Sequence, residues 1–237
     1  LGRRQRQMCI RDSNEALAKI ACDSKYWMWI NGEMAVFEGQ LKRGPSPDDT
    51  YYDEVDIAPF LKQGKNFISI LVWYFGKDGF SHNSSGKAAL IFDCQTQGFD
   101  LLSDLTWKAS IRREFGTAGL PLPNFRLPES SIRYDARLGN FDFISSNNLK
   151  WGRTRSLGTP PILPWNNLVK RPLPLWRDYG MKNYTNQMKF PFVSNGDTIV
   201  CHLPYNAQIT PYFKIEAKEG EEIKILTDHY QGGGPYN

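Results

Sequence analysis

The sequence predicts an all-β protein of the β-sandwich type, and three observations carry that prediction. Short runs of alternating or wholly apolar residues follow one another from residue 15 to residue 110, separated by glycine- and proline-containing turns. An Asn31-Gly32 pair lies between two such runs. It is typical of a two-residue hairpin, because both central positions of a type I′ turn need positive φ. Only residues 57–63 have the pattern of a helical turn.

The first two expected strands cover residues 16–22 and 25–30. The second alternates between two bulky faces, which predicts a strand that is central to a two-layer structure. Its two faces are Tyr26, Met28 and Ile30 on one side, and Trp27 and Trp29 on the other. After the Asn-Gly turn the chain returns as a third strand over residues 33–39.

A polar loop follows, and then strands are expected at residues 51–57, 66–75 and 87–94. Asp56 can cap the single helical turn between the first two of these, with Gly64 just past its end. Between the strands expected at 66–75 and 87–94 lies GKDGFSHNSSG, which predicts a flexible loop with a solvated His82.

The chain changes character at residue 116, which sets the expected domain boundaries. Residues 14–115 form the predicted sandwich, and residues 116–188 are rich in proline. Proline cannot donate to a ladder, so this segment should wrap the sandwich as extended chain with short strands hidden in it. Residues 189–237 regain strand patterns, at 197–203, 212–217 and 222–227, and predict the start of a second, truncated sandwich.

Residues 1–13 are set apart from the rest. Met8 to Ser13 reads like a translation of the transposon end used to prepare sequencing libraries, so the segment is interpreted as an adapter scar and excluded from the fold. A basic arm for nucleic acid is the alternative. Without the four arginines and one aspartate of this segment, the net charge falls from +4 to +1. That charge implies no polyanion partner, and we expect no nucleic acid to bind.

Several classes of chemistry find no support in the sequence. No apolar run approaches the ~20 residues that span a bilayer, so no membrane partner is expected. The histidines and cysteines have no metal-ligand spacing, and no serine or cysteine nucleophile motif occurs. We therefore expect no metal, no cofactor and no catalytic residue. Cys22 and Cys94 are expected as buried thiols, with a disulfide between them as the alternative.

Aromatic and acidic side chains supply the candidate binding residues. Tryptophan rings stack on the apolar faces of sugars, although core packing is the commoner use of each. The candidates are Trp73 in a strand, Trp165 and Trp176 in the proline-rich segment, and His229 beside a glycine run. The carboxylates singled out are Asp53, Asp56, Asp135 and Asp228, for each of which a turn or cap role is the simpler interpretation.

Several segments, taken in order, resemble one family. They are SKYWMWINGEMAVFEG, TYYDEVDIAPFLKQGKNFISILVWYFG, LTWKAS, Tyr134-Asp135-Ala136-Arg137, LVKRPLPLWRDYG and TPYFKIEAKEGEEIKILTDHYQGGG. Together they are similar to the N-terminal, non-catalytic region of bacterial α-L-rhamnosidases of glycoside hydrolase family 78. The resemblance implies a jelly-roll, galactose-binding-like β-sandwich, and adds Tyr134, Asp135 and Arg137 to the candidate carbohydrate contacts.

The resemblance also implies where the catalytic residues of the parent enzyme lie. Such enzymes are inverting hydrolases of terminal α-L-rhamnosides whose acid and base belong to a following α/α toroid. Nothing in this sequence matches the toroid, so we expect a truncated, inactive fragment whose partners are rhamnose-containing glycans and the missing toroid. A periplasmic or secreted location is implied in the same way. The alternatives are a stand-alone carbohydrate-binding module and a jelly roll from an enzyme of the β-galactosidase or β-glucuronidase type.

Overall fold

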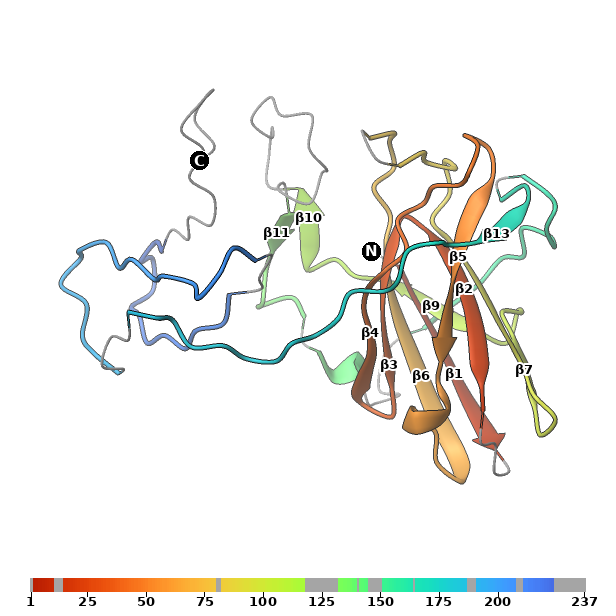
Figure 1. Ribbon diagram of the computed structural model, residues 1–237, viewed down its shortest axis with the longest axis horizontal. Helices are drawn as coiled ribbons and strands as arrows, with labels where there is room; N and C mark the ends of the chain where they lie inside the picture. Colours follow the sequence, from red (N-terminus) through yellow and green to blue (C-terminus); the bar gives the residue numbers. More distant parts are fainter. Residues whose placement is uncertain are drawn as a thin grey trace. The chain divides into compact units, whose positions relative to one another are not determined.

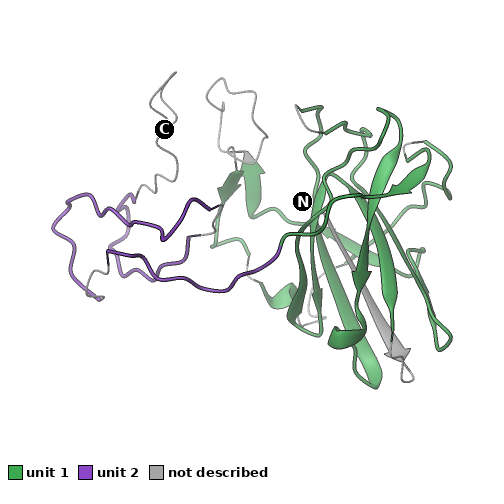
Figure 2. Cartoon of the chain, in the orientation of Figure 1, with its two compact units in different colours: residues 1–176 green, residues 177–237 purple. Residues whose placement is uncertain are grey.

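A computed structural model (Figure 1) describes residues 2–10, 15–79, 82–117, 132–139, 141–144, 151–163, 165–186, 191–207 and 211–223. The chain divides into two compact units, Leu1–Trp176 and Arg177–Asn237 (Figure 2). The described residues contain strands and short 3₁₀ turns and no α-helix, which confirms the all-β class. Within this part of the chain, no helix has the length and apolarity to cross a membrane.

The described part of the first unit contains two large sheets and a small two-stranded one (Figure 1). The larger sheet has six strands in the order β12 (Gly152–Arg153), β9 (Lys108–Ile111), β1 (Gly2–Ile10), β6 (Gly64–Trp73), β3 (Lys25–Ile30) and β4 (Glu33–Gly39). The smaller has five in the order β13 (Leu168–Lys170), β5 (Thr50–Asp56), β2 (Leu17–Asp23), β7 (Ala89–Gln95) and β8 (Asp100–Leu102). All neighbours are antiparallel except β13 and β5.

The core lies between the two sheets. Alternate residues of β3 and β6 face alternate residues of β2 and β7, as a period of two requires. The buried cluster includes Tyr26, Met28 and Ile30 from β3, Ile68, Ile70 and Val72 from β6, Ile20 and Cys22 from β2, and Leu90 and Phe92 from β7. Trp107, which precedes β9, closes one end with its ring 5.4 Å from that of Phe92. The predicted division of β3 into two faces is therefore confirmed, and the face with Tyr26, Met28 and Ile30 is the inner one.

The Asn31-Gly32 hairpin forms as predicted, with φ of 53° and 89° at the two turn positions. The Asn31 side chain has a second use: its amide nitrogen donates to the Phe60 carbonyl and to Asn66 Oδ1, each at 2.8 Å. The predicted helical turn is a 3₁₀ turn, η1 (Ala58–Phe60). Its N-cap residue is Ile57, which makes no side-chain cap bond, and not the expected Asp56. Asp56, one residue earlier, still supports the turn, because its Oδ1 accepts a hydrogen bond from the Ala58 N–H at 3.0 Å.

Residues 2–10 were expected to lie outside the fold, and the structure differs. They form β1, paired along its whole length with β6 and over residues 2–5 with β9. An open sheet edge offers unpaired N–H and C=O groups to any extended chain, so pairing needs no particular side chains. The structure thus includes residues 2–10 in a sheet, contrary to their exclusion from the fold. The origin of the segment as an adapter scar stays a prediction.

The loop expected to be flexible between β6 and β7 is held against the sandwich in its described residues. The Ser85 backbone N–H and hydroxyl both donate to Asp23 Oδ2, at 2.6 and 2.7 Å. His82 is buried, its Nε2 lying 2.7 Å from the Lys77 carbonyl oxygen and its ring 4.7 Å from that of Phe75. The prediction of a solvated His82 was wrong, because these contacts join residues that sequence patterns treat separately.

The proline-rich segment contains the expected short strands: β11 (Ile132–Tyr134), β12 and β13. β11 pairs with β10 (Phe115–Thr117), and a second 3₁₀ turn, η3, covers Asp142–Ile144. β12 and β13 extend the two sheets, so the first compact unit reaches Trp176 and does not end at the expected residue 115.

The second unit lacks the strands expected at residues 197–203 and 212–217, and the third, at 222–227, lies mostly outside the described residues. A few hydrogen bonds join separate segments of this unit, such as the one that the Thr185 N–H donates to the His202 carbonyl at 2.9 Å. Several of its apolar side chains, among them Val200, Phe213 and Ile215, are more than half exposed. Strand propensity mostly reflects packing against neighbours, so an apolar run without a covering layer need not form a strand.

Cys22 and Cys94 are buried thiols, which confirms the expectation, and the alternative disulfide between them is not formed. Burial, followed by the charges of Asp93 and Asp56, raises the pKa of the Cys94 thiol to about 11. Cys201 in the second unit is exposed.

We therefore expect an alkylating reagent at neutral pH to modify Cys201 rapidly and to leave Cys22 and Cys94 unmodified until the sandwich unfolds, because the thiolate is the nucleophile. Peptide mapping by mass spectrometry after a timed pulse checks this. Equal labelling of Cys94 and Cys201 in the native protein would contradict the burial.

Candidate functional site

Asp53 of β5 is a buried carboxylate with hydrogen-bond partners on both of its oxygens. Its Oδ2 accepts from the Tyr26 hydroxyl at 3.0 Å and from the Gln40 N–H at 2.7 Å, and its Oδ1 accepts from Arg171 Nε at 2.5 Å. The side chain is only 2% exposed. Burial, and then the charge of Asp53, raises the pKa of Tyr26 well above its usual value. A buried carboxylate whose two oxygens are both occupied holds the fold together and has no free lone pair facing solvent.

The Tyr134-Asp135-Ala136-Arg137 segment forms a turn of its own after β11. Asp135 accepts from Arg137 at Nη2 (2.6 Å), Nε (2.9 Å) and the backbone N–H (3.1 Å). These hydrogen bonds lower the Asp135 pKa to about 2, the side-chain bond from Arg137 being the main cause. The Tyr134 ring packs 4.9 Å from that of Phe115. The Asp135 carboxylate and the Arg137 guanidinium are thus partners within the turn. This arrangement agrees with the simpler interpretation of Asp135, as a turn residue, over that of a ligand contact.

The three candidate tryptophans have different environments. Trp165 is 1% exposed and packs on the outer face of the five-stranded sheet, so its ring is part of the core and not free to contact a ligand. Trp176 is 59% exposed and Trp73 is half-buried. His229 and Asp228 lie outside the described residues.

Trp73 belongs to an aromatic strip, by which we mean Trp27, Trp73 and Phe75. The Trp27 and Trp73 rings stack at 6.2 Å with an interplanar angle of 25°, and Phe75 meets Trp73 edge-on at 4.9 Å. All three side chains are half-buried. Partly exposed aromatic faces of this kind can pack against apolar ligand surfaces. The sequence did not single out Trp27 as a candidate. The alternating pattern of β3 places this side chain on one face of the strand, but it does not tell how much of the ring is exposed.

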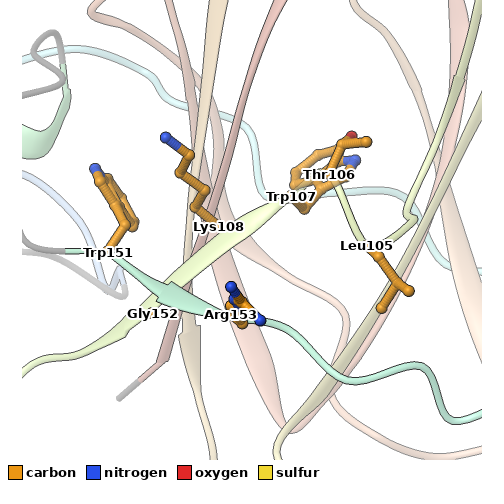
Figure 3. Close-up of a pocket in the computed structure, with 7 residues that line it drawn as sticks. All are labelled: Leu105, Thr106, Trp107, Lys108, Trp151, Gly152 and Arg153. Carbon is orange, nitrogen blue, oxygen red and sulfur yellow. The ribbon is translucent and has the colours of Figure 1, made fainter.

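A cavity of about 400 Å³ lies at the edge of the six-stranded sheet, where β12 joins β9 (Figure 3). It is lined by Leu105, Thr106, Trp107, Lys108, Trp151, Gly152 and Arg153. Trp107 forms a buried wall and donates from Nε1 to the Leu102 carbonyl at 2.9 Å. Thr154 Oγ1 donates to the Trp107 carbonyl at 3.1 Å, which ties the two lining segments together.

None of the predicted contact residues lines this cavity, and sequence reasoning missed it. Its two lining segments are more than forty residues apart and meet only through the β9–β12 pairing, Gly152 with Ala109 and Arg153 with Lys108. LTWKAS marked one of these segments as a motif, but no local pattern indicates which strand it joins.

No family model and no curated protein matches the chain. Among solved structures, the chain is similar to a GH78 family rhamnosidase of Bacillus sp. GL1, with a TM-score of 0.58 and 24% identity over 73% of this chain and 18% of that one. It is also similar to the α-L-rhamnosidase of Aspergillus terreus, with a TM-score of 0.50 and 21% identity over 71% of this chain and 20% of that one.

The fold therefore defines this chain as a β-sandwich of the class found within α-L-rhamnosidases. The resemblance indicated by the sequence motifs is confirmed at the level of the fold. The chain spans about a fifth of the length of these enzymes.

Proposed function

We propose that the chain is the non-catalytic, amino-side β-sandwich region of an α-L-rhamnosidase-like glycoside hydrolase, with a scaffolding or substrate-access role. The observation that carries the proposal is the fold match to the Bacillus sp. GL1 rhamnosidase, which takes in 73% of this chain and only 18% of the enzyme. The ordered motifs from residue 24 to residue 234 support it independently, because they do not depend on the coordinates.

The chemistry of the described carboxylates also supports a non-catalytic role. Inverting glycoside hydrolysis needs two carboxyl groups about 6.5–9.5 Å apart across a sugar, one of them a general acid with a raised pKa. Asp53 is buried with both oxygens hydrogen-bonded, and Asp135 has a lowered pKa and is held by Arg137. The residues that line the cavity at β9 and β12 include no carboxylate. In the proposed parent enzyme, cleavage of terminal α-L-rhamnosides would belong to a toroid that follows the sandwich.

We expect no release of product when the purified 237-residue chain is incubated with an aryl α-L-rhamnoside, because the proposed acid and base are not in it. Absorbance of the released phenol checks this. Sequencing the source DNA past codon 237 tests the same proposal, with an expected open frame that encodes amphipathic helices. Turnover that co-purifies with the chain to constant specific activity would contradict a non-catalytic role.

A stand-alone carbohydrate-binding module is the second candidate, and the aromatic strip favours it. Two stacked, half-buried tryptophans on a sheet face offer a surface on which a sugar ring can lie. A stop codon directly after codon 237, together with heat of binding for a rhamnose-containing oligosaccharide, would favour the module over the scaffold.

A further inference from the structure

The cavity at the β9–β12 edge brings two positive charges together. Lys108 and Arg153 are directly opposed in the antiparallel pair, and residues opposed in this way direct their side chains to the same face of a sheet. Cβ atoms of opposed residues lie about 4.5–5.5 Å apart, and like charges in such a pair are destabilising. The local sheet geometry therefore places repulsion where most sheets place an attractive pair.

Within the described residues, no acidic side chain forms an ion pair with either cation. The lining residues include neither aspartate nor glutamate, and in the described part of the chain neither Lys108 nor Arg153 forms a salt bridge. Elsewhere in the same unit some cations of the sheets do have acidic partners, as Lys170 has in Glu54 and Lys25 has in Glu38 at 3.5 Å. An anion in the cavity would supply the missing charge.

A tryptophan completes the same face. Trp151 precedes Arg153 by two residues, so its side chain leaves the same side of the chain, and its ring lines the cavity beside Lys108 (Figure 3). Its Nε1–H is buried and has no hydrogen-bond acceptor in the described part of the chain. A buried donor without an acceptor is uncommon in native proteins and indicates a missing partner.

We propose that this cavity binds a carboxylate-bearing sugar, a uronic acid residue of an acidic oligosaccharide. The carboxylate would lie between Lys108 and Arg153, where the guanidinium can donate two parallel hydrogen bonds. The indole of Trp151 would pack on the ring face and give its N–H to a sugar oxygen. A cavity of about 400 Å³ is within the range of small-ligand sites. The requirement for an anion follows from the charges, whereas the choice of a sugar rests on the proposed function.

The test is calorimetric titration of the full chain with a trigalacturonate, at low and at physiological salt, with a neutral trisaccharide and inorganic phosphate as the other ligands. We expect trigalacturonate to bind, more weakly at the higher salt, and the neutral sugar and phosphate to bind at least tenfold more weakly. The informative variant is Lys108→Glu, which should weaken trigalacturonate binding by about tenfold or more.

Lys108→Glu also separates loss of the site from loss of the fold. The new carboxylate would face Arg153 across the pair, so the thermal midpoint should stay the same or rise while binding is lost. Lys87→Glu is the matched control, since Lys87 is exposed and the variant has the same change in net charge. Trp151→Phe keeps a ring without the N–H and should give a smaller loss than Lys108→Glu.

Equal affinity of the Lys108→Glu and Lys87→Glu variants would overturn the site, and equal affinity for phosphate and trigalacturonate would overturn the sugar assignment. The outcome is distinguishable from that of the proposed function. If the source DNA past codon 237 encodes a toroid and the chain binds no uronate, only the inference of a uronic acid site fails. Lys108-dependent binding combined with a stop codon after residue 237 would remove only the rhamnosidase assignment.

Discussion

Replacing Asp53 by alanine is expected to lower the free energy of unfolding of the sandwich by about 3–5 kcal/mol, the range for breaking a buried ion pair by removing one partner. The variant leaves the Arg171 guanidinium uncompensated where its side chain is 17% exposed, and one Arg171 terminal nitrogen already has no acceptor in the described structure. It also removes the acceptor of the Tyr26 hydroxyl and of the Gln40 N–H. Urea denaturation followed by tryptophan fluorescence gives the value.

Three further variants identify the source of this loss. Glu54→Ala is the matched control, because Glu54 is the next residue of β5 and its partner Lys170 is largely exposed, so its effect should be much smaller. Tyr26→Phe removes one hydrogen bond and no charge, and should cost only about 1 kcal/mol. Asp53→Ala combined with Arg171→Met should recover part of the loss, since no buried charge is then left unpaired. A midpoint for Asp53→Ala equal to that of Glu54→Ala would show that the ion pair does not hold the segment.

Local features of this fold could be predicted from the sequence because their causes lie within a few residues. The Asn31-Gly32 turn depends on two φ angles, and the inner face of β3 depends on a period of two. The 3₁₀ turn after Asp56 is likewise a matter of adjacent groups. Each of these was placed correctly without any knowledge of the tertiary structure.

The contacts that define the candidate sites, in contrast, join residues that are far apart in the sequence. Asp53 and Arg171 are 118 residues apart, and Lys108 meets Arg153 only because β12 joins the sheet edge at β9. Periodicity places a side chain on a face, but it does not say which strand comes alongside. The charge pair of the cavity and the Asp53 ion pair were therefore out of reach of sequence reasoning.

The same limit explains the strands wrongly expected in the second unit. Residues 197–203 and 212–217 have the β-branched and aromatic content of strands, yet the structure gives them no ladder partner and exposes Val200 and Phe213. Apolar content indicates that a segment prefers to be covered, whereas the covering element decides whether a strand forms.

Trp165 shows how burial can depend on small residues elsewhere. The proline-rich segment that contains it suggested a surface position, but its ring is 1% exposed and packs against Ala21 of β2 and Ala89 of β7. Two alanines on the outer face of the five-stranded sheet leave room for an indole. The neighbouring backbone is fixed as well, since Thr50 Oγ1 donates to the Trp165 carbonyl at 2.9 Å.

We therefore expect Trp165→Ala to lower the free energy of unfolding by about 3–5 kcal/mol, as for other buried tryptophans, because the rigid sheet cannot collapse to fill the space. Trp176→Ala removes the same side chain from a position 59% exposed and should cost far less. Urea denaturation followed by far-UV circular dichroism compares the two variants, which have the same number of tryptophans. If Trp165 were a ligand-contact residue outside the core, both variants would unfold at the midpoint of the unmodified chain. A loss confined to Trp165→Ala would instead show that the proline-rich segment stabilises the sandwich from outside its sheets.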